Sequence, residues 1–332
     1  MPSVLQPRTG DALSIRGPRP FHRTMRLHQR LAFSPFFCRA TGSDGTAEGR
    51  AKRVFFPGCS LSAYAPEHVL SAWRYLSGRL EDVGVLLKCC GKPLKLMSMA
   101  GEFQKRFDTV RHDLDRMGAE EVIVACQNCY AIFRQFDGGR RVRSLWTILR
   151  DTGLPEGRHG SARGLEVSVQ DSCTTRDVPE IYESVRAILS ELGVAVREME
   201  YARDRARCCG CAPMIAAGDA KLGREAMKRR AAESPCGTVV SYCASCRSAM
   251  RTGGRESLHL LDLVFGNGRP GHPTPPPDRS LRSWFNRWRT RRLLGSVLRA
   301  SELPSRDARG QGTESTSAGP TPAAGSRPAA AS

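Results

Sequence analysis

Residues 121–129 read EVIVACQNC, and residues 238–246 read TVVSYCASC. In each stretch, a short apolar run rich in β-branched residues leads directly into a Cys-x-x-Cys turn. Such a run, bounded by a turn, predicts a strand. A Cys-x-x-Cys turn directs two thiolates at one metal. Each stretch therefore predicts a strand that ends at a pair of ligands.

The two stretches complete a longer repeat of cysteines. Each copy has a single cysteine, then an adjacent pair followed by glycine, then the Cys-x-x-Cys turn. The spacing is C-x29-CC-x35-C-x2-C in the first copy and C-x34-CC-x33-C-x2-C in the second. The first copy consists of Cys59, Cys89, Cys90, Cys126 and Cys129, and the second of Cys173, Cys208, Cys209, Cys243 and Cys246. Five positions that recur in order predict two homologous domains.

The residues between the cysteines predict an α/β fold in both copies. The predicted strands are 54–56, 83–87, 121–125, 165–169, 194–199 and 238–242. A proline suited to a first helical turn opens a helical pattern at Pro66 and again at Pro179. We expect two tandem cysteine-rich domains, residues 53–153 and 154–267, each a small sheet flanked by helices. Because ligand sites in open α/β sheets gather at the carboxyl ends of the strands, the five thiols of each copy are expected to converge there.

The chemistry of these thiols has three possible forms. Thirteen cysteines, an odd number, cannot all pair in internal disulfides, and no secretory signal is recognisable. A reducing, cytoplasmic location is therefore expected, where abundant cysteine indicates metal or redox chemistry. Five thiolates per copy favour an iron–sulfur cluster, since such clusters are held chiefly by cysteine. Structural zinc and metal-free thiol chemistry remain as alternatives.

Both copies resemble the CCG, or cysteine-rich, domain. The pair resembles the B-type component of heterodisulfide reductase and related iron–sulfur subunits of lactate-utilisation and glycolate-oxidase systems. The resemblance covers about residues 53–267. It implies one or two [4Fe–4S] clusters, of a noncubane kind in the heterodisulfide reductase member, where a disulfide is reduced in two one-electron steps. Carried over, the five cysteines of each copy would hold one cluster. Other members of the family serve in electron transfer.

Two departures from the family pattern bear on the function. A ferredoxin-type C-x2-C-x2-C-x3-C-P run is absent from the sequence, so electrons are expected from a flavoprotein or ferredoxin-type partner. Cys211 adds a thiol to the second copy and is interpreted as a buried residue or an alternative ligand, while Cys38 and Cys236 lie outside the pattern. We expect an oxidoreductase subunit of the heterodisulfide-reductase B type. The alternative is a non-catalytic electron-transfer or assembly module, docked through its C-terminal helix.

The charge of the chain lies mainly in its ends. The formal net charge is +18, and most of the excess belongs to residues 1–52 and 268–332. We expect both segments to be disordered tails, apart from a Pro-rich linker and a basic amphipathic helix at about 279–299. The first 24 residues are interpreted either as a transit segment or as the result of a start codon placed too far upstream. Docking of this helix to a membrane surface or a partner groove is favoured over packing on its own domain. No nucleic-acid-binding module is recognisable.

Four residues near the cysteines are weaker candidates. His259 is interpreted as a core histidine, with proton relay as the alternative. The residues Lys88, Lys92 and Arg207 flank the Cys-Cys-Gly turns and could offset the negative charge of a cluster.

Overall fold

The first sheet is built around the predicted strands of the first copy. The computed structural model describes residues 19–210, 219–266 and 281–300. Within these residues the first sheet has five strands in the order β1-β3-β2-β4-β5. They are β1 (Arg39–Thr41), β2 (Arg53–Phe56), β3 (Val83–Leu87), β4 (Glu121–Val124) and β5 (Arg141–Ser144). β1 pairs antiparallel with β3, and the other pairs are parallel.

The second sheet repeats the order of the first without its antiparallel edge. Its four described strands are parallel and lie in the order β7-β6-β8-β9. They are β6 (Glu166–Gln170), β7 (Ala195–Val196), β8 (Thr238–Ser241) and β9 (Glu256–His259). β6, β7, β8 and β9 therefore correspond to β2, β3, β4 and β5. The structure confirms two homologous α/β units, although the strand predicted at 194–199 keeps only two residues.

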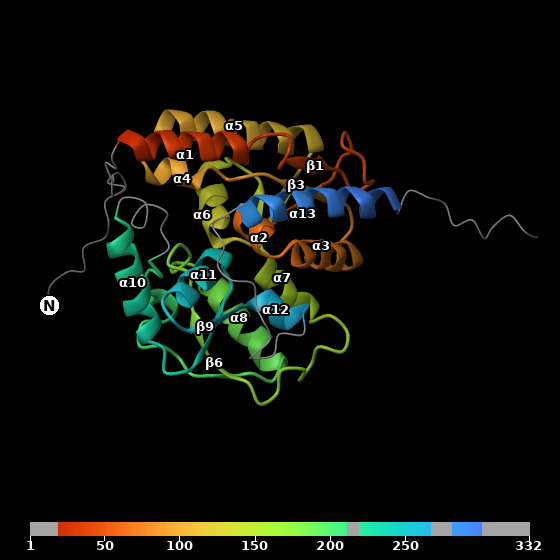
Figure 1. Cartoon of the computed structure of the whole chain (residues 1–332). Helices are drawn as coiled ribbons and strands as arrows, with labels where there is room; N and C mark the ends of the chain where they lie inside the picture. The colour runs from red at the N-terminus through yellow and green to blue at the C-terminus, as the bar shows by residue number, and fades with distance from the viewer. Residues whose placement is uncertain (1–18, 211–218, 267–280, 301–332) are drawn as a thin grey trace, which may run out of the picture.

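Helices cover both sheets (Figure 1). In the first unit they are α2 (Cys59–Tyr64), α3 (Pro66–Arg79), α4 (Lys92–Leu96), α5 (Ala100–Met117), α6 (Gln127–Phe136) and α7 (Leu145–Thr152). In the second they are α8 (Pro179–Glu191), the 3₁₀ turn η1 (Arg203–Arg205), α10 (Ala220–Ala232), α11 (Ala244–Thr252) and α12 (Leu260–Val264). Proline opens α3 and α8, as the sequence predicts.

One hydrophobic core runs through both units. The buried side chains of β2, β4 and α7 belong to the same cluster as those of β6, α8 and α12. At the junction, the ring of Trp146 on α7 lies 6.3 Å from that of Tyr242 and 5.9 Å from that of His259, measured between centroids. Since α7 also packs against α8, the two units are fixed relative to each other.

The N-terminal segment differs from the expectation of a tail. Residues 19–52 contain helix α1 (Arg19–Ala32) and strand β1, and Ala51 is fully buried. β1 extends the first sheet through its register of Arg39 with Leu87. The basic composition concealed this segment, because the pairing that orders it is made with residues far along the chain. The expectation for residues 1–18 lies outside the described residues.

The C-terminal helix also differs from the preferred interpretation. α13 (Leu281–Ala300) packs on α2 and α3 of its own chain, across the first unit (Figure 1). Thr290 is fully buried and donates to the carbonyl of Ser62 at 3.0 Å, and Asn286 donates to the carbonyl of Ala63 at 2.8 Å. Of the apolar face expected to dock elsewhere, Leu294 is buried and Trp284 and Trp288 are half-buried, so the helix packs on its own domain, which was the alternative to the favoured interpretation. Leu281 and Phe285 remain exposed.

The other predictions for the chain ends, the linker and the tail beyond Ala300, lie outside the described residues, as does Cys211. In the described parts of the chain, no helix has the length and apolarity that a bilayer-spanning segment needs.

Candidate functional site

The cysteines of the first copy lie where its parallel strands end. Cys59 is the first residue of α2, immediately beyond β2, and the adjacent pair Cys89 and Cys90 follows β3. Cys126 follows β4 as the N-cap of α6, and Cys129 lies in the first turn of that helix. Because these strands are parallel and adjacent, their carboxyl ends bring all five thiols to one edge of the sheet.

The second copy repeats this placement with one difference. Cys243 is the N-cap of α11 beyond β8, and Cys246 lies in the first turn of that helix. The pair at Cys208 and Cys209 follows η1, since β7 is too short to lead into it directly. Cys173 lies in a turn beyond β6, where the first copy has a helix.

A glycine allows the first thiols to approach one another. Gly58, at φ +81°, immediately precedes Cys59. A Cβ at this position would lie 2.8 Å from the Cβ of Cys126 and 3.2 Å from the Sγ of Cys129. A side chain there would therefore displace the Cys-x-x-Cys turn, so the closeness of these ligands depends on glycine.

The first-copy thiols form a connected group. The Sγ atoms of Cys59 and Cys89 are 3.8 Å apart, and the backbone N–H of Gly91 donates to the Cys89 sulfur at 3.4 Å. Cys90 makes hydrogen bonds with Cys89 and with Cys129, which in turn interacts with Cys126. The structure therefore brings together the five cysteines that the sequence predicts for the first site.

The same chain of contacts continues into the second copy. Cys126 makes a hydrogen bond with Cys243, and Cys243 makes one with Cys246. Cys246 interacts with Cys209, while Cys173 interacts with Cys208. The sequence predicts two separate convergences. The structure adds that the Cys-x-x-Cys turns of the two copies meet at the junction between the units.

The proximity of the thiols changes their acidity unequally. Hydrogen bonds from Cys129 and Cys89 lower the pKa of Cys90 to about 5. A hydrogen bond with Cys129 lowers the pKa of Cys126, but the one with Cys243 and burial raise it to about 11. Protons are therefore shared within a buried sulfur group. Binding of a metal group that replaces these protons would relieve the mutual repulsion of neighbouring thiolates.

Access to the two sites differs. Within the described residues, Cys208 is the one cysteine of the motifs that is exposed, and Cys59 and Cys173 are half-buried. The remaining seven motif cysteines are buried. The second motif is therefore the more open of the two at its Cys-Cys pair.

A polar cluster that the sequence did not indicate joins the units beside the thiols. Asp262 on α12 accepts hydrogen bonds from the hydroxyl of Tyr64 at 2.7 Å and from Nε2 of His68 at 2.7 Å. Its other contact is the backbone N–H of His259, also at 2.7 Å. The guanidinium of Arg247 lies 4.4 Å from the centre of the Tyr64 ring. Asp262 thus fixes α2 and α3 of the first unit to α12 of the second.

His259 lies in this cluster as a buried N-cap. Its Nδ1 accepts a hydrogen bond from the backbone N–H of Leu261, and the residue is 1% exposed. Burial lowers the pKa of His259 to about 3, so the ring is neutral at physiological pH. The interpretation as a core histidine agrees with this geometry.

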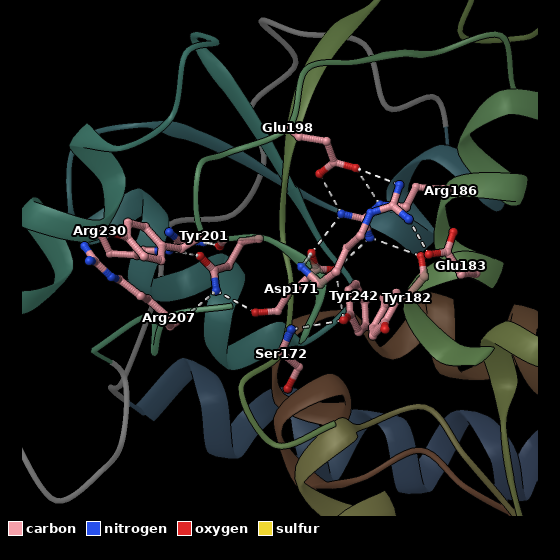
Figure 2. Close-up of polar contacts among 12 residues, drawn as sticks. Asp171, Ser172, Tyr182, Glu183, Arg186, Glu198, Tyr201, Arg207, Arg230 and Tyr242 are labelled. Carbon is pink, nitrogen blue, oxygen red and sulfur yellow. Dashed lines mark hydrogen bonds and ion pairs between the residues drawn. The ribbon is translucent and has the colours of Figure 1, made fainter. Parts of the chain in front are cut away.

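A second network holds the loop that carries Cys173 (Figure 2). Asp171 receives a bidentate hydrogen bond from Arg186, with both distances 2.8 Å, and a third bond from the hydroxyl of Tyr242 at 3.1 Å. That hydroxyl accepts the backbone N–H of Ser172 at 3.0 Å. Because Tyr242 precedes Cys243 in sequence, the network ties the Cys173 loop to the second Cys-x-x-Cys turn.

The predicted charge partners are largely occupied. Arg207 forms an ion pair with Glu233 at 2.9 Å, and its guanidinium lies 3.3 Å from the centre of the Tyr201 ring (Figure 2). Lys88 forms an ion pair with Asp113 at 2.6 Å. The charges of Arg207 and Lys88 are therefore already compensated by the carboxylates of Glu233 and Asp113. Lys92 is half-buried at the first position of α4.

The cysteines outside the motifs have structural contacts. Cys38 donates to the carbonyl of Ala32 at 3.3 Å, and burial raises its pKa to about 11. Cys236 is buried, with its sulfur 3.8 Å from a carboxylate oxygen of Glu166.

The ligands that the two motifs offer are chemically suited to an iron–sulfur cluster. The side chains that both motifs bring to the sheet edges are thiols, which are the ligands such clusters use. Among the described residues, no group of three or more His, Cys, Asp or Glu side chains is placed so that it could hold a single metal ion.

Comparison with known proteins places the cysteine motifs in one family. The model of the cysteine-rich domain named CCG matches residues 53–134 and 167–251, which together make up about half of the chain. Both matched segments contain a complete five-cysteine motif.

Two relatives are the D subunits of the dihydromethanophenazine:CoB–CoM heterodisulfide reductases of Methanosarcina mazei and Methanosarcina barkeri. The M. mazei protein is 23% identical over 245 residues, covering 67% of this chain and 58% of the relative. The M. barkeri protein is 23% identical over 259 residues, covering 69% and 58%. The chain thus spans somewhat more than half the length of these relatives.

Among solved structures, an aspartate racemase of Picrophilus torridus aligns with 65% of this chain and 91% of its own length at 9% identity. The TM-score of this alignment is 0.30, which is too low to define a shared fold.

Proposed function

This chain belongs to the CCG cysteine-rich domain family, and from that premise we propose that it is an iron–sulfur subunit of an oxidoreductase of the heterodisulfide-reductase B type. The observation that carries the proposal is the meeting of the two motifs through Cys126 and Cys243, in a chain whose relatives include heterodisulfide reductase subunits. The ligands would be the five cysteines of each motif, holding one or two [4Fe–4S] clusters.

The proposed reaction is the reduction of a disulfide. One sulfur–sulfur bond breaks, two electrons and two protons are added, and two thiols form. The bound clusters would supply the electrons one at a time, with a flavoprotein or a ferredoxin-type protein as the donor. The more open face at Cys208 offers the substrate an approach to the site.

The residues of the chain prepare this chemistry in three ways. The N-termini of α6 and α11 direct backbone N–H groups at Cys126 and Cys243, which act to lower the pKa of both thiols. The Asp262 cluster holds the two units together, so the thiols on either side of the junction keep their positions. Burial of most of the thiols excludes water from the first motif.

Metal analysis tests the proposal. We expect anaerobically purified protein to contain iron and acid-labile sulfide, with an EPR signal in one oxidation state. Cys126→Ser and Cys243→Ser should lower the iron and sulfide content per chain. Cys236→Ser is the matched control, since this cysteine is also buried but makes no thiol contact among the described residues, and it should retain both. Zinc without labile sulfide in the wild-type protein would refute the proposal.

The burial of the first motif supports a second candidate, a non-catalytic electron carrier. An assay of disulfide reduction with an artificial one-electron donor separates the two. Consumption of disulfide with loaded protein supports the enzyme. Reversible reduction of the clusters without any consumption, over a panel of disulfides, supports the carrier.

A further inference from the structure

The two terminal helices meet over the first motif. α1 and α13 lie outside the segments that match the CCG family, at residues 53–134 and 167–251. The ring of Trp284 on α13 lies 5.1 Å from that of His28 on α1 and 4.8 Å from that of Phe37, measured between centroids. α13 packs along α2, the helix that begins at Cys59. These elements are therefore an addition to the part of the chain that the family model matches.

Arg287 is the buried charge of this addition. The residue is 6% exposed. In the described part of the chain its guanidinium donates to the carbonyl of Ala32 at 3.1 Å and lies 4.7 Å from the Trp284 ring and 5.5 Å from the Phe37 ring, and none of these contacts is a carboxylate. A cation taken out of water without a counter-ion costs several kcal/mol. Its contacts among the described residues therefore leave the charge of Arg287 without a carboxylate partner.

A cluster bound at the first motif would be a source of negative charge beside α13. Asn286 and Thr290, which flank Arg287 on α13, donate to the carbonyls of Ala63 and Ser62 on α2, the helix that begins at Cys59. Arg287 is therefore held beside the helix that begins with Cys59, and its positive charge acts on that thiol. A cluster held by several thiolates is anionic, and it would be the counter-ion that Arg287 lacks.

Gln29 on α1 approaches the same site from the other helix. The residue is 1% exposed, and its side-chain amide lies 3.8 Å from the sulfur of Cys89. In the metal-free protein the Cys89 thiol donates to the amide oxygen. A deprotonated ligand sulfur can only accept, so the amide must then present its N–H group to the sulfur.

We propose that Arg287 and Gln29 are positioning residues for the first cluster, Arg287 as its counter-ion and Gln29 as a hydrogen-bond donor to the Cys89 sulfur. The inference rests on the proposed iron–sulfur function and deepens it. A cation and an N–H donor beside a cluster stabilise its more negative, reduced form and raise its reduction potential. The first site is thereby a closed, higher-potential site, and the open motif with Cys208 is the one that meets the reaction partner.

The test is an anaerobic redox titration of the full chain, followed by EPR. The signal of the first site is identified as the one lost in Cys59→Ser. In Arg287→Met we expect the midpoint potential of that signal to shift to lower values. Gln29→Leu should shift it in the same direction. The matched control is Arg289→Met, because Arg289 lies on the same helix but forms a surface ion pair with Glu67 at 2.5 Å, and its potential should equal that of the wild type.

Arg287→Lys separates charge from packing. It should retain the wild-type iron content and most of the wild-type potential, even if Arg287→Met fails to hold iron. An unshifted potential in a loaded Arg287→Met protein would refute the role of Arg287, as would equal iron loss in Arg287→Lys and Arg287→Met. An unshifted Gln29→Leu would refute the role of Gln29. Wild-type protein without iron and sulfide would instead overturn the proposed function, a result distinct from all of these.

Discussion

Replacement of Asp262 by Asn is the sharpest test of how the two units are joined. The carboxylate is the common acceptor for the Tyr64 hydroxyl, the His68 ring and the backbone N–H of His259. Its side chain is 9% exposed, so water cannot replace a lost partner freely. The Asn amide has one oxygen where Asp has two, and its NH₂ group would face donors.

The structure sets the size of the effect. At least one of the three donors loses its acceptor, and the bonds that remain are no longer to a charged group. A hydrogen bond to a charged group contributes about 1.5–3 kcal/mol, and removal of one member of a buried ionic cluster costs about 3–5 kcal/mol. We therefore expect Asp262→Asn to lower the free energy of unfolding by about 3–5 kcal/mol. Tyr64→Phe removes a single donor and should cost about 1.5–3 kcal/mol.

Urea unfolding of the metal-free protein at pH 7, followed by circular dichroism, measures both variants. The control is Asp108→Asn on α5, because that side chain is 51% exposed and its ion pair with Arg111 is at 3.9 Å. This substitution should change the free energy of unfolding by about 0.5 kcal/mol or less. A change in Asp262→Asn no larger than that of the control would refute the joining role of Asp262.

The pH dependence gives an independent check. Burial acts to raise the pKa of Asp262, but the hydrogen bond and charge of His68 outweigh it, and the pKa in the folded protein is lowered. Ionised Asp262 therefore contributes its full stability above the unfolded-state pKa of about 3.9, and the contribution is lost as the pH falls through the lower, folded-state pKa. The difference between wild type and Asp262→Asn should shrink in acid below about pH 4. A difference that grows in acid would contradict this assignment.

Three further substitutions test local features. Gly58→Ala places a Cβ 2.8 Å from that of Cys126 at a φ of +81°, so we expect a loss of about 1–2 kcal/mol in stability and less iron bound per chain; normal iron content would show that the turn has room to adjust. Gly78→Ala in α3 meets no atom within 4 Å and should stabilise the protein by about 0.5–1 kcal/mol in urea unfolding, with iron content unchanged. Ser144→Ala removes the cap that accepts the backbone N–H of Trp146 and should cost about 1 kcal/mol, measured in the same way, while an unchanged midpoint would argue against the cap.

The sequence predicted those parts of the fold whose signal is local. β2, β3, β4 and β8 are short runs with apolar centres that lead to cysteines, and burial on both faces favours this apolar character. The edge strands β1, β5 and β9 were not predicted, for a physical reason. β5 has the sequence RVRS, in which Arg143 faces solvent in part and pairs with Glu121 across the sheet at 3.6 Å. An edge strand needs no apolar pattern, because its order comes from pairing with a neighbour.

The polar groups around the thiols were even less visible in the sequence. His68 and Asp262 are 194 residues apart, and neither has a neighbour in sequence that indicates the pairing. The same holds for Gln29 and Arg287, which reach the first motif from opposite ends of the chain. Composition alone suggested that both ends were tails. Both ends are rich in positively charged residues that face solvent, and the few side chains that are buried do not stand out in the composition.

The position of α13 has a consequence for the order in which the protein matures. Both cysteine motifs are complete once Cys246 has been synthesised, but α13 begins only at Leu281 and is the last described helix to leave the ribosome. Until it docks, α2 lacks the cover that Thr290 and Asn286 provide through their hydrogen bonds to the carbonyls of Ser62 and Ala63. Synthesis from the N-terminus therefore leaves an interval in which the first motif exists without its C-terminal cover. In the proposed function, iron and sulfide delivered in this interval would reach the first motif before α13 covers α2.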